Sequence, residues 1–345
     1  MKELNIELKT HPYKIIIENG ALKKTAEYIK DIYKSGKVFI VTDDVVEKLY
    51  LKTVIDSLNN GGYETDYVVI PHGEESKNLH YYAYVCEELL KKDIRRSQLI
   101  IALGGGVIGD LTGFVASILY RGIPYVGIPT SLLAQMDSSI GGKTAIDFYN
   151  RKNILGAFKQ PARVIIDPET HKTLDEREFN NGMGELIKHG AIGNKALLDS
   201  LSKKSLIDED VIRESLLVKK RVVELDEFDT GERMSLNFGH TFGHIIELKY
   251  GYKHGEAVAI GMLMALKMGE DLGVTPKDCY PTIYNILKLY NLPVVEYDYK
   301  EYLKETMYDK KNIAGTINFI LLDKLGHYVI YKLTEKEIKE KLVWM

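Results

Sequence analysis

Cysteine is scarce in this chain, since only Cys86 and Cys279 occur among its 345 residues. Two cysteines cannot form a disulfide framework, and a chain of this length does not need one. We therefore expect two free thiols in a reducing compartment. Long apolar runs are also missing: no stretch reaches the length of a membrane span, and the charged residues 1–4 do not begin a signal peptide. These absences predict a cytoplasmic protein that does not enter a membrane.

A strong net charge is absent as well. Lysine and arginine number 46 against 49 aspartates and glutamates, which leaves a formal net charge of -3. Such a balance creates no field that would attract nucleic acid, although local basic clusters can still bind a small anion. The 45% hydrophobic and 28% charged fractions are typical of a globular protein. The length exceeds what one hydrophobic core usually serves, so we expect two domains.

The first half of the chain alternates between short apolar runs and helical patterns. Strands are predicted at 14–18, 37–43, 67–71, 99–103 and 125–128, with helices at 46–59 and 79–91. Continuous apolar strands separated by helices predict a parallel sheet covered on both faces. Ligands of such sheets bind beyond the carboxyl ends of the strands, which places Asp43, the loop 72–77 and Gly104 to Gly106 at one edge. We expect residues 1–174 to form an α/β dinucleotide-binding domain.

A glycine run follows one of these strands and opens a helix. Residues 104–109 match the pattern Gly-x-Gly-x-x-Gly, whose bare backbone lets a pyrophosphate approach a helix N-terminus. The pattern alone is weak evidence for nucleotide binding, and it follows several strands instead of the first. The alternative is that the glycines only form a tight turn between a strand and a helix. Because Asp43 and Glu74 are expected on the same edge, we favour nucleotide binding. A Walker motif ending at Lys143 is rejected, since the position of its first glycine is Asp137.

From about residue 175 the pattern becomes helical. Helices are predicted at 178–192, 210–225, 237–250, 256–271 and 282–289, followed by short extended pieces at 316–322 and 327–331. Residues 175–345 are therefore expected to form a mainly helical domain. The chain as a whole is predicted to combine this domain with the N-terminal parallel-sheet domain.

The helical half contains a pattern that is typical of a metal site. His240 and His244 are four residues apart, so on a helix both rings project from one face. His254 follows, and a helix bearing Glu185 precedes them. Three such ligands with one open position make a catalytic zinc site. The alternative is that the pair is ordinary polar surface, but the adjacent Gly239 and Gly243 cost helix stability, which indicates that something approaches the backbone there.

Taken in order, several motifs resemble one family. Residues 104–110, 136–144, the pair Gly184 and Glu185, 236–244 and 254–256 are similar to those of the 3-dehydroquinate synthases, which are sugar-phosphate cyclases. The resemblance runs from about Asp43 to residues 309–311. It implies that the substrate is 3-deoxy-D-arabino-heptulosonate 7-phosphate in the shikimate pathway of aromatic amino acid biosynthesis. Bound NAD oxidises one alcohol transiently, phosphate is eliminated, the hydride returns, and an intramolecular aldol reaction closes the ring. The net reaction is that of a phosphorus–oxygen lyase.

The resemblance also implies roles for individual residues. Zinc or cobalt is expected on Glu185, His240 and His254, with His244 as a proton-handling or supporting group. The substrate's anionic groups are expected to contact Arg121, Lys143, Lys152, Lys188, Lys219, Arg233 and Lys310, with Asn153 and Asn237 as neutral donors. The NAD contacts are expected from Asp43, Glu74, Lys77, Gly105, Gly106, Val107, Ile108, Gly109, Asp110, Thr130, Ser131, Asp137, Thr170 and Thr173, with Lys143 and Lys152 shared between both ligands. Lys219 lies on an ordinary charged helix, so its assignment depends most on the resemblance.

The chain departs from the family pattern at Val45, Asp229 and Asn318, where asparagine, glutamate and arginine are common. None of these removes a metal ligand. Three alternatives stay open: a sister cyclase with another sugar phosphate, a metal-dependent polyol dehydrogenase, and an inactive dinucleotide-binding module. The metal that the cell supplies is not specified by the ligand types. A homodimer is the family expectation.

Overall fold

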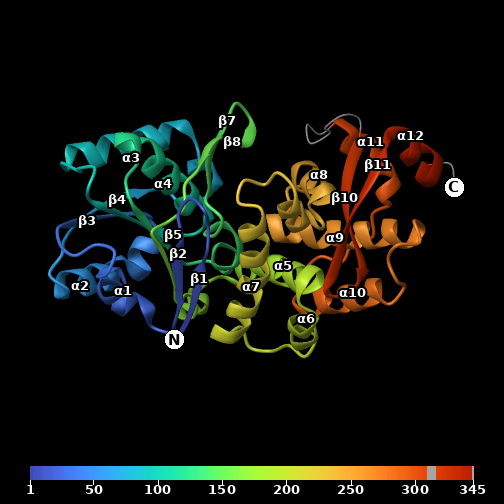
Figure 1. Ribbon diagram of the computed structural model, residues 1–345, viewed down its shortest axis with the longest axis horizontal. Helices are drawn as coiled ribbons and strands as arrows, with labels where there is room; N and C mark the ends of the chain where they lie inside the picture. The colour runs from blue at the N-terminus through green and yellow to red at the C-terminus, as the bar shows by residue number, and fades with distance from the viewer. Residues whose placement is uncertain (309–315, 344–345) are drawn as a thin grey trace. The chain divides into compact units, whose positions relative to one another are not determined.

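The computed structural model describes residues 1–308 and 316–343, with only the backbone at 307, 308 and 343. It divides into two compact units (Figure 1). The first consists of Met1–Leu174 together with Ile207–Arg213, and the second of Asp175–Leu206 and the chain from Glu214 onward. The segment Ile207–Arg213 thus belongs to the first unit although it follows part of the second in sequence. Among the described residues, no helix is long and apolar enough to span a membrane.

The first unit is built on a seven-stranded sheet. Its strand order is β1-β2-β9-β6-β5-β3-β4, and every pairing is parallel except that of β1 with β2. The strands are β1 (Lys2–Ile6), β2 (Tyr13–Ile17), β3 (Lys37–Asp43), β4 (Glu64–Ile70), β5 (Leu99–Gly104), β6 (Tyr125–Pro129) and β9 (Arg163–Ile166). The five strands predicted from apolar runs are confirmed. The sequence did not predict β1, which alternates polar and apolar residues at the sheet edge, or the four-residue β9.

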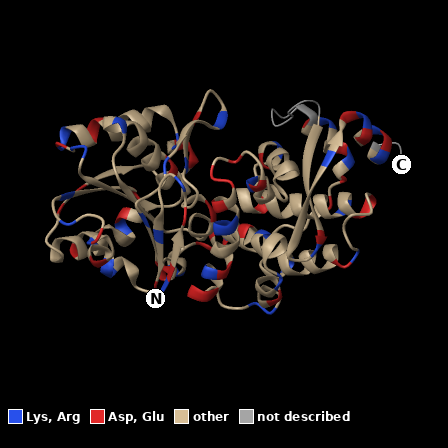
Figure 2. Ribbon diagram, viewed as in Figure 1, with Lys and Arg blue, Asp and Glu red and all other residues tan. Residues whose placement is uncertain are grey.

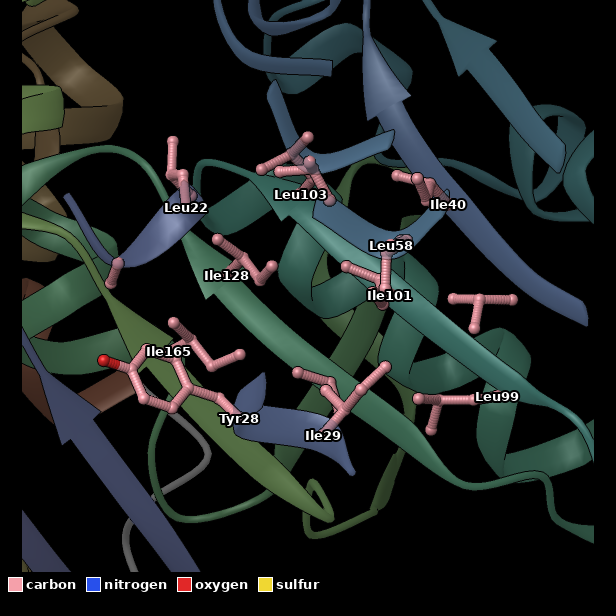
Figure 3. Packing of buried hydrophobic residues seen from close by; sticks show 14 of the residues in the cluster. Leu22, Tyr28, Ile29, Ile40, Leu58, Leu99, Ile101, Leu103, Ile128 and Ile165 are labelled. Atoms are coloured by element: carbon pink, nitrogen blue, oxygen red, sulfur yellow. The ribbon is translucent and has the colours of Figure 1, made fainter. Parts of the chain in front are cut away.

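Helices cover both faces of this sheet, and alternate residues of the central strands β3, β5 and β6 contribute to the two resulting cores. Figure 3 shows the first of these cores. Ile40 and Ile101 face the core that contains Tyr28 and Leu58, whereas Phe39 faces the other. The first face carries α1 (Thr25–Ile29) and α2 (Lys52–Asn60), and the second carries α3 (Leu79–Lys91) and α4 (Gly106–Ile118). Both faces are therefore buried, which explains the continuous apolar character of the strands. Short helical turns connect them: η1 (Ala21–Lys24), η2 (Glu47–Leu51), η3 (Glu74–Ser76), η4 (Leu119–Arg121), η5 (Ala134–Ser138) and η6 (Pro168–Thr173).

A separate hairpin of β7 (Lys143–Phe148) and β8 (Arg151–Phe158) extends from the first unit. No strand was predicted from the sequence in this segment. The reason is that β8 is exposed along nearly its whole length and leaves no burial pattern in the sequence. In Figure 2 the ribbon is coloured as basic residues near the end of this hairpin. Lys152 is adjacent to Arg151 there.

The second unit is mainly helical, as predicted. Its helices are α5 (Glu176–Gly193), α6 (Lys195–Leu201), α7 (Glu209–Leu225, whose first turn lies in the first unit), η7 (Glu232–Asn237), α8 (His240–Tyr250), α9 (His254–Asp271), α10 (Cys279–Leu289), α11 (Tyr299–Tyr308), α12 (Glu335–Ile338) and η8 (Lys339–Val343). The two predicted extended pieces form the antiparallel pair of β10 (Thr316–Lys324) and β11 (His327–Thr334). Helix α9 is buried along most of its length, and α5, α8 and α10 pack against it. It forms the centre of this unit, as an apolar helix without a polar face must.

Candidate active site

Three helices of the second unit bring the predicted metal ligands together. Glu185 lies in the middle of α5 and is fully buried, while His240 and His254 are the first residues of α8 and α9. The Nε2 atoms of His240 and His254 lie 3.5 and 3.4 Å from Oε1 of Glu185. One potential ligand atom from each residue lies within 4.8 Å of the other two. Residues separated by almost 70 positions in the sequence thus form one compact cluster.

Glycines make this convergence possible because the helix backbones touch. A Cβ atom on Gly255 would lie 1.8 Å from the carbonyl oxygen of Asn181 in α5, and one on Gly261 would lie 1.9 Å from that of Gly239. Gly239 also has a φ of 79°, a conformation that glycine adopts without strain and that starts α8 at the histidine. A Cβ on Gly243 would lie 3.0 Å from the carbonyl oxygen of Ala257. The expectation that something approaches the backbone beside the histidines is confirmed, and the neighbour is α9.

Each histidine has a partner for its other ring nitrogen. Nδ1 of His240 lies 3.1 Å from the carbonyl oxygen of Phe238, and Nδ1 of His254 lies 3.2 Å from Oε2 of Glu247. A proton on Nδ1 would satisfy both contacts and leave Nε2 as the electron-pair donor toward Glu185. The sequence prediction gave Glu247 no role. Its position three residues after His244 and seven after His240, on the same face of α8, is the signal that was available.

The cluster fits a divalent metal. Two atoms that are each about 2.1 Å from a tetrahedral zinc ion lie about 3.4 Å apart, which matches the spacing between Glu185 and the two imidazoles. Neither carboxylate oxygen of Glu185 has a hydrogen-bond partner of good geometry within the described part of the chain, although Lys188 forms an ion pair with Oε2. Lys188 meets Oε2, whereas Oε1 faces the two imidazoles and suits a metal cation between them, since a buried carboxylate oxygen is costly unless it is satisfied. Ordinary polar residues on a solvated helix face do not fit such burial.

Burial and neighbouring charges shift the pKa values of all three candidate ligands. Burial opposes ionisation of Glu185, but Lys188 and the imidazoles of His254 and His240 hold its pKa well below its ordinary value. Burial, together with Lys188, holds the pKa of His240 well below its usual range, so the ring stays neutral and able to bind a metal. Burial lowers the pKa of His254, but Glu185 and Glu247 outweigh it and raise that pKa to about 9. The two carboxylates therefore favour positive charge at this point of the cluster.

The fourth predicted residue of this region, His244, lies beside the cluster. Its ring centroid is 5.4 Å from that of His240 and 6.2 Å from that of His254. It is partly exposed, whereas His240 is buried. This arrangement leaves the His244 ring next to the candidate ligands and accessible from outside.

The predicted cations of the second unit are buried, which is unusual for such side chains. Lys188, Lys219 and Arg233 are only 1%, 3% and 3% exposed. Lys219, whose assignment depended most on the resemblance, is thus buried although its helix is rich in charged residues. Asn237, at the end of η7, is partly buried, and Lys310 lies outside the described residues. Lys188 is paired with Glu185 in the structure. A buried cation attracts an anionic ligand more strongly than an exposed one does, because less water screens its charge.

The loop that carries Arg233 is organised by one carboxylate. Asp226 accepts hydrogen bonds from the backbone N–H groups of Thr230, Gly231 and Arg233 at 2.9, 2.7 and 3.0 Å. The guanidinium of Arg233 donates from Nη1 to the carbonyl oxygen of Glu227 at 2.7 Å. The position of Arg233 is thus fixed by the loop that contains it.

In the first unit, the predicted NAD residues gather at the carboxyl edge of the sheet. Asp43 ends β3, Glu74 and Lys77 follow β4, and Thr130 and Ser131 follow β6. The run from Gly105 to Asp110, with Val107, Ile108 and Gly109, joins β5 to α4, Asp137 lies in η5, and Thr170 and Thr173 lie in η6 after β9. Strands β3 and β5 are neighbours, but the chain continues from them toward opposite edges of the sheet. That is the switch point at which doubly wound sheets bind ligands.

Details of the β5–α4 turn support close approach of a ligand. Gly104, Gly105 and Gly109 line a pocket together with Ser138 and Lys143. A Cβ on Gly104 would lie 2.7 Å from the side chain of Ile108, so this glycine is needed for packing. The N-terminus of α4 has no side-chain cap. Its backbone N–H groups are therefore available to an anion.

Several NAD candidates already have protein partners. Nζ of Lys77 lies 2.6 Å from Oδ2 of Asp110, and Asp43 accepts from the backbone N–H of Val45 and Val46 at 3.0 and 2.9 Å. Burial raises the pKa of Asp43, against those two hydrogen bonds. The hydroxyl of Thr170 is 3.0 Å from Nε2 of Gln135 and 2.9 Å from the carbonyl oxygen of Asp167. Thr173 bonds the carbonyl oxygen of Thr170 and the hydroxyl of Tyr50. These last two side chains serve the local fold.

The substrate candidates of the first unit lie on exposed segments. Lys143 begins β7, Lys152 and Asn153 lie in β8, and Arg121 ends η4. Arg121 and Asn153 have φ values of 61° and 54°, in the left-handed region that residues other than glycine seldom adopt. Such conformations concentrate at functional sites, where the surrounding structure maintains them.

Comparison with known proteins shows which family the chain belongs to. Family models described as 3-dehydroquinate synthase N-terminal and C-terminal match residues 67–181 and 182–312. A 3-dehydroquinate synthase of Clostridium botulinum (strain Alaska E43 / Type E3) is 45% identical over 337 residues, which cover 94% of this chain and 96% of the relative. The chain belongs to the 3-dehydroquinate synthase family. It is therefore an enzyme of the shikimate pathway, a phosphorus–oxygen lyase, as the motifs implied.

Further relatives support the same assignment to the 3-dehydroquinate synthases. The enzyme of Streptococcus suis (strain 05ZYH33) is 42% identical, with 99% of each chain covered. Among solved structures, 2-epi-5-epi-valiolone synthase from Streptomyces hygroscopicus, with NAD+ and Zn2+ bound, has a TM-score of 0.86 at 26% identity and 98% coverage of both chains. Glycerol dehydrogenase from Schizosaccharomyces pombe has a TM-score of 0.61 at 16% identity, with 81% of this chain and 76% of that chain covered, and shows only the common fold.

Proposed function

We propose that this 3-dehydroquinate synthase uses NAD and a divalent metal, zinc or cobalt, and that its own residues hold them as follows. The metal is held by Glu185, His240 and His254, and the observation that carries this assignment is their convergence around a buried carboxylate that lacks a good hydrogen-bond partner. The substrate is 3-deoxy-D-arabino-heptulosonate 7-phosphate and the products are 3-dehydroquinate and phosphate. When bound, NAD supplies hydride transfer and the metal supplies Lewis-acid polarisation of substrate hydroxyls.

Within the second unit, the proposed task of Lys188, Lys219 and Arg233 is to neutralise an anionic group of the substrate. Their burial supports this, because a desolvated cation attracts an anion more strongly than an exposed one does. Asn237 adds a neutral donor, and Lys310 stays a prediction outside the described residues. His244 is proposed to exchange a proton between a ring nitrogen and a substrate oxygen, which its partial exposure beside the cluster permits.

Within the first unit, the backbone N–H groups at the N-terminus of α4 are proposed to bind the pyrophosphate of NAD. Asp43 would accept from a ribose hydroxyl, and Glu74, Lys77, Asp110, Thr130, Ser131 and Asp137 would line the same edge of the sheet. Lys143, Lys152, Asn153 and Arg121 are proposed to contact anionic groups. Thr170 and Thr173 would act by holding η6 in place, since their hydroxyls bond to neighbouring residues.

A phosphate-release assay tests the function. Purified protein would be mixed with 3-deoxy-D-arabino-heptulosonate 7-phosphate, catalytic NAD and zinc or cobalt. The expected result is stoichiometric phosphate without accumulation of NADH. Accumulating NADH with glycerol and no phosphate would instead indicate a polyol dehydrogenase. Phosphate released only from other sugar phosphates would indicate a sister cyclase.

We also propose a cytoplasmic homodimer. Both cysteines are free, which suits a reducing compartment. On the β7–β8 hairpin, the large apolar residues Phe148, Tyr149, Ile154, Leu155 and Phe158 are exposed, and such a surface is commonly covered by another protein surface. Light scattering after size-exclusion chromatography should give twice the chain mass of 39.2 kDa. A mass equal to one chain would refute the dimer.

A further inference from the structure

The β7–β8 hairpin has a local irregularity beside two proposed substrate residues. The pairing register shifts between Ile146 and Phe148, so that Asp147 lies at the break. On the opposite strand, Asn153 has a φ of 54° and lies between Arg151 and Leu155, the residues paired on either side of the break. Oδ1 of Asp147 accepts a hydrogen bond from this N–H at 2.7 Å. One carboxylate therefore satisfies the backbone group that the irregular register would otherwise leave unpaired.

The main chain of Asp147 makes a second connection, to the loop after β4. Its N–H donates to the carbonyl oxygen of Lys77 at 2.8 Å, and Asn78 forms an isolated parallel bridge with it. Nζ of Lys77 lies 2.6 Å from the carboxylate of Asp110 in α4. Asp147 is thus hydrogen-bonded both to Lys77 and to Asn153. Lys77 and its partner Asp110 are residues that we assigned to NAD, whereas Asn153 and the adjacent Lys152 are residues that we assigned to the substrate.

A register break of this kind determines where neighbouring side chains point. In a regular strand successive side chains alternate between faces, so a change of one residue moves a side chain to the opposite face. Bulges next to active sites are known to redirect side chains in this way. The left-handed conformation at Asn153 needs stabilisation, and the Asp147 carboxylate is the group that supplies it here.

We propose that Asp147 is a positioning residue for the substrate-binding side chains of the hairpin. Its carboxylate holds the backbone at Asn153 and thereby sets the direction of Lys152 and Asn153, while its N–H anchors the hairpin to the loop of Lys77. This inference rests on the proposed function. It does not require Asp147 to touch the substrate or NAD.

The test compares Asp147→Ala with Asp147→Asn. Alanine removes the acceptor, whereas the asparagine side chain keeps an oxygen that can accept from the Asn153 N–H. Asn150→Gly is the matched control, because Asn150 lies exposed at the tip of the same hairpin and its φ of 57° is one that glycine adopts without strain. For each protein, KM and kcat would be measured by phosphate release, and the dissociation constant of NAD by calorimetry. Circular dichroism and thermal melting would establish that the variants are folded.

We expect Asp147→Ala to raise KM on the order of tenfold, the effect of losing one hydrogen bond to a charged group. Asp147→Asn should restore most of this loss, and Asn150→Gly should leave KM near the wild-type value. NAD affinity should stay within about twofold, because the link to Lys77 is made by the backbone. A KM that is unchanged in the alanine variant would overturn the proposal, as would an equal rise in the asparagine variant or in the tip control.

A second measurement does not depend on the variants or on catalysis. In the wild-type protein, the amide of Asn153 should exchange with solvent more slowly than the amides of exposed hairpin-tip residues, because it is hydrogen-bonded to Asp147. Exchange as fast as at the tip would overturn the proposal even if an alanine variant failed to fold. Failure of wild-type protein to release phosphate would refute the proposed function. Normal wild-type turnover with an insensitive Asp147 would refute only the positioning role.

Discussion

Removal of the Glu247 carboxylate tests whether its contact with the imidazole of His254 contributes to metal binding. Oε2 of Glu247 lies 3.2 Å from Nδ1 of His254, and the Glu247 side chain is only 14% exposed. Carboxylates in this position fix the orientation of the ring and raise its basicity, and their loss typically costs 10- to 100-fold in metal affinity. Since 3.2 Å is at the long end for this contact, we expect a loss of about tenfold, or about 1.4 kcal/mol, for Glu247→Ala.

The assay is competition for zinc against a chromophoric chelator, with the cobalt absorption spectrum as a second readout. Glu247→Gln keeps an oxygen acceptor and should lose less affinity than the alanine variant. Glu270→Ala is a matched control in α9, since Glu270 is 17% exposed and has only a loose ion pair of 3.8 Å with Lys267. His254→Ala, which removes a proposed ligand, shows how much zinc affinity is lost when one ligand is missing. Wild-type zinc affinity and an unchanged cobalt spectrum in Glu247→Ala would refute the reasoning.

Three other changes give separate expectations. Lys152→Ala should raise the free energy of substrate binding by about 1.5 kcal/mol, the lower end for a charge-assisted contact because the residue is exposed, and a steady-state KM measurement checks this. Asp226→Ala should lower the free energy of unfolding by about 2 kcal/mol at pH 7, as measured by urea denaturation. Burial opposes ionisation of Asp226, but the backbone N–H groups of its loop hold the pKa of its carboxyl below the ordinary value. The stabilisation that Asp226 provides should therefore be present above about pH 4 and be lost as the pH falls further. Gly255→Ala should prevent stable folding, because its Cβ would lie 1.8 Å from the Asn181 carbonyl oxygen. Gly109→Ala should instead raise the melting temperature slightly, because open space surrounds its Cβ and alanine stabilises helix α4 more than glycine does; thermal melting checks both.

The sequence was sufficient for those elements whose burial is regular. The strands that form the centre of the sheet are buried on both faces, so their apolar runs stand out from the surrounding residues. The helix of His254 is recognisable because it packs on all sides. The β7–β8 hairpin was missed for the opposite reason, since its apolar side chains are largely exposed and its register is irregular.

Only part of the candidate metal site could be predicted from residue spacing. Spacing on one helix predicted that His240 and His244 share a face, and their ring centroids are 5.4 Å apart. No spacing rule places His240 beside a glutamate 55 positions earlier, so that pairing came from the family resemblance. The role of Glu247 depends on an interaction with the next helix, and it became visible only when both helices were placed.

The packing of the second unit gives a physical reason for where its cluster lies. Helices α5, α8 and α9 approach to backbone contact through glycines, and this closeness brings potential ligand atoms of Glu185, His240 and His254 within 4.8 Å of one another. Any side chain added at Gly255 or Gly261 would separate the helices and with them the ligands. Metal affinity and core stability should therefore fail together in this unit. The substrate candidates on the hairpin differ, because their arrangement depends on a few local hydrogen bonds, so changes there should alter binding without altering stability.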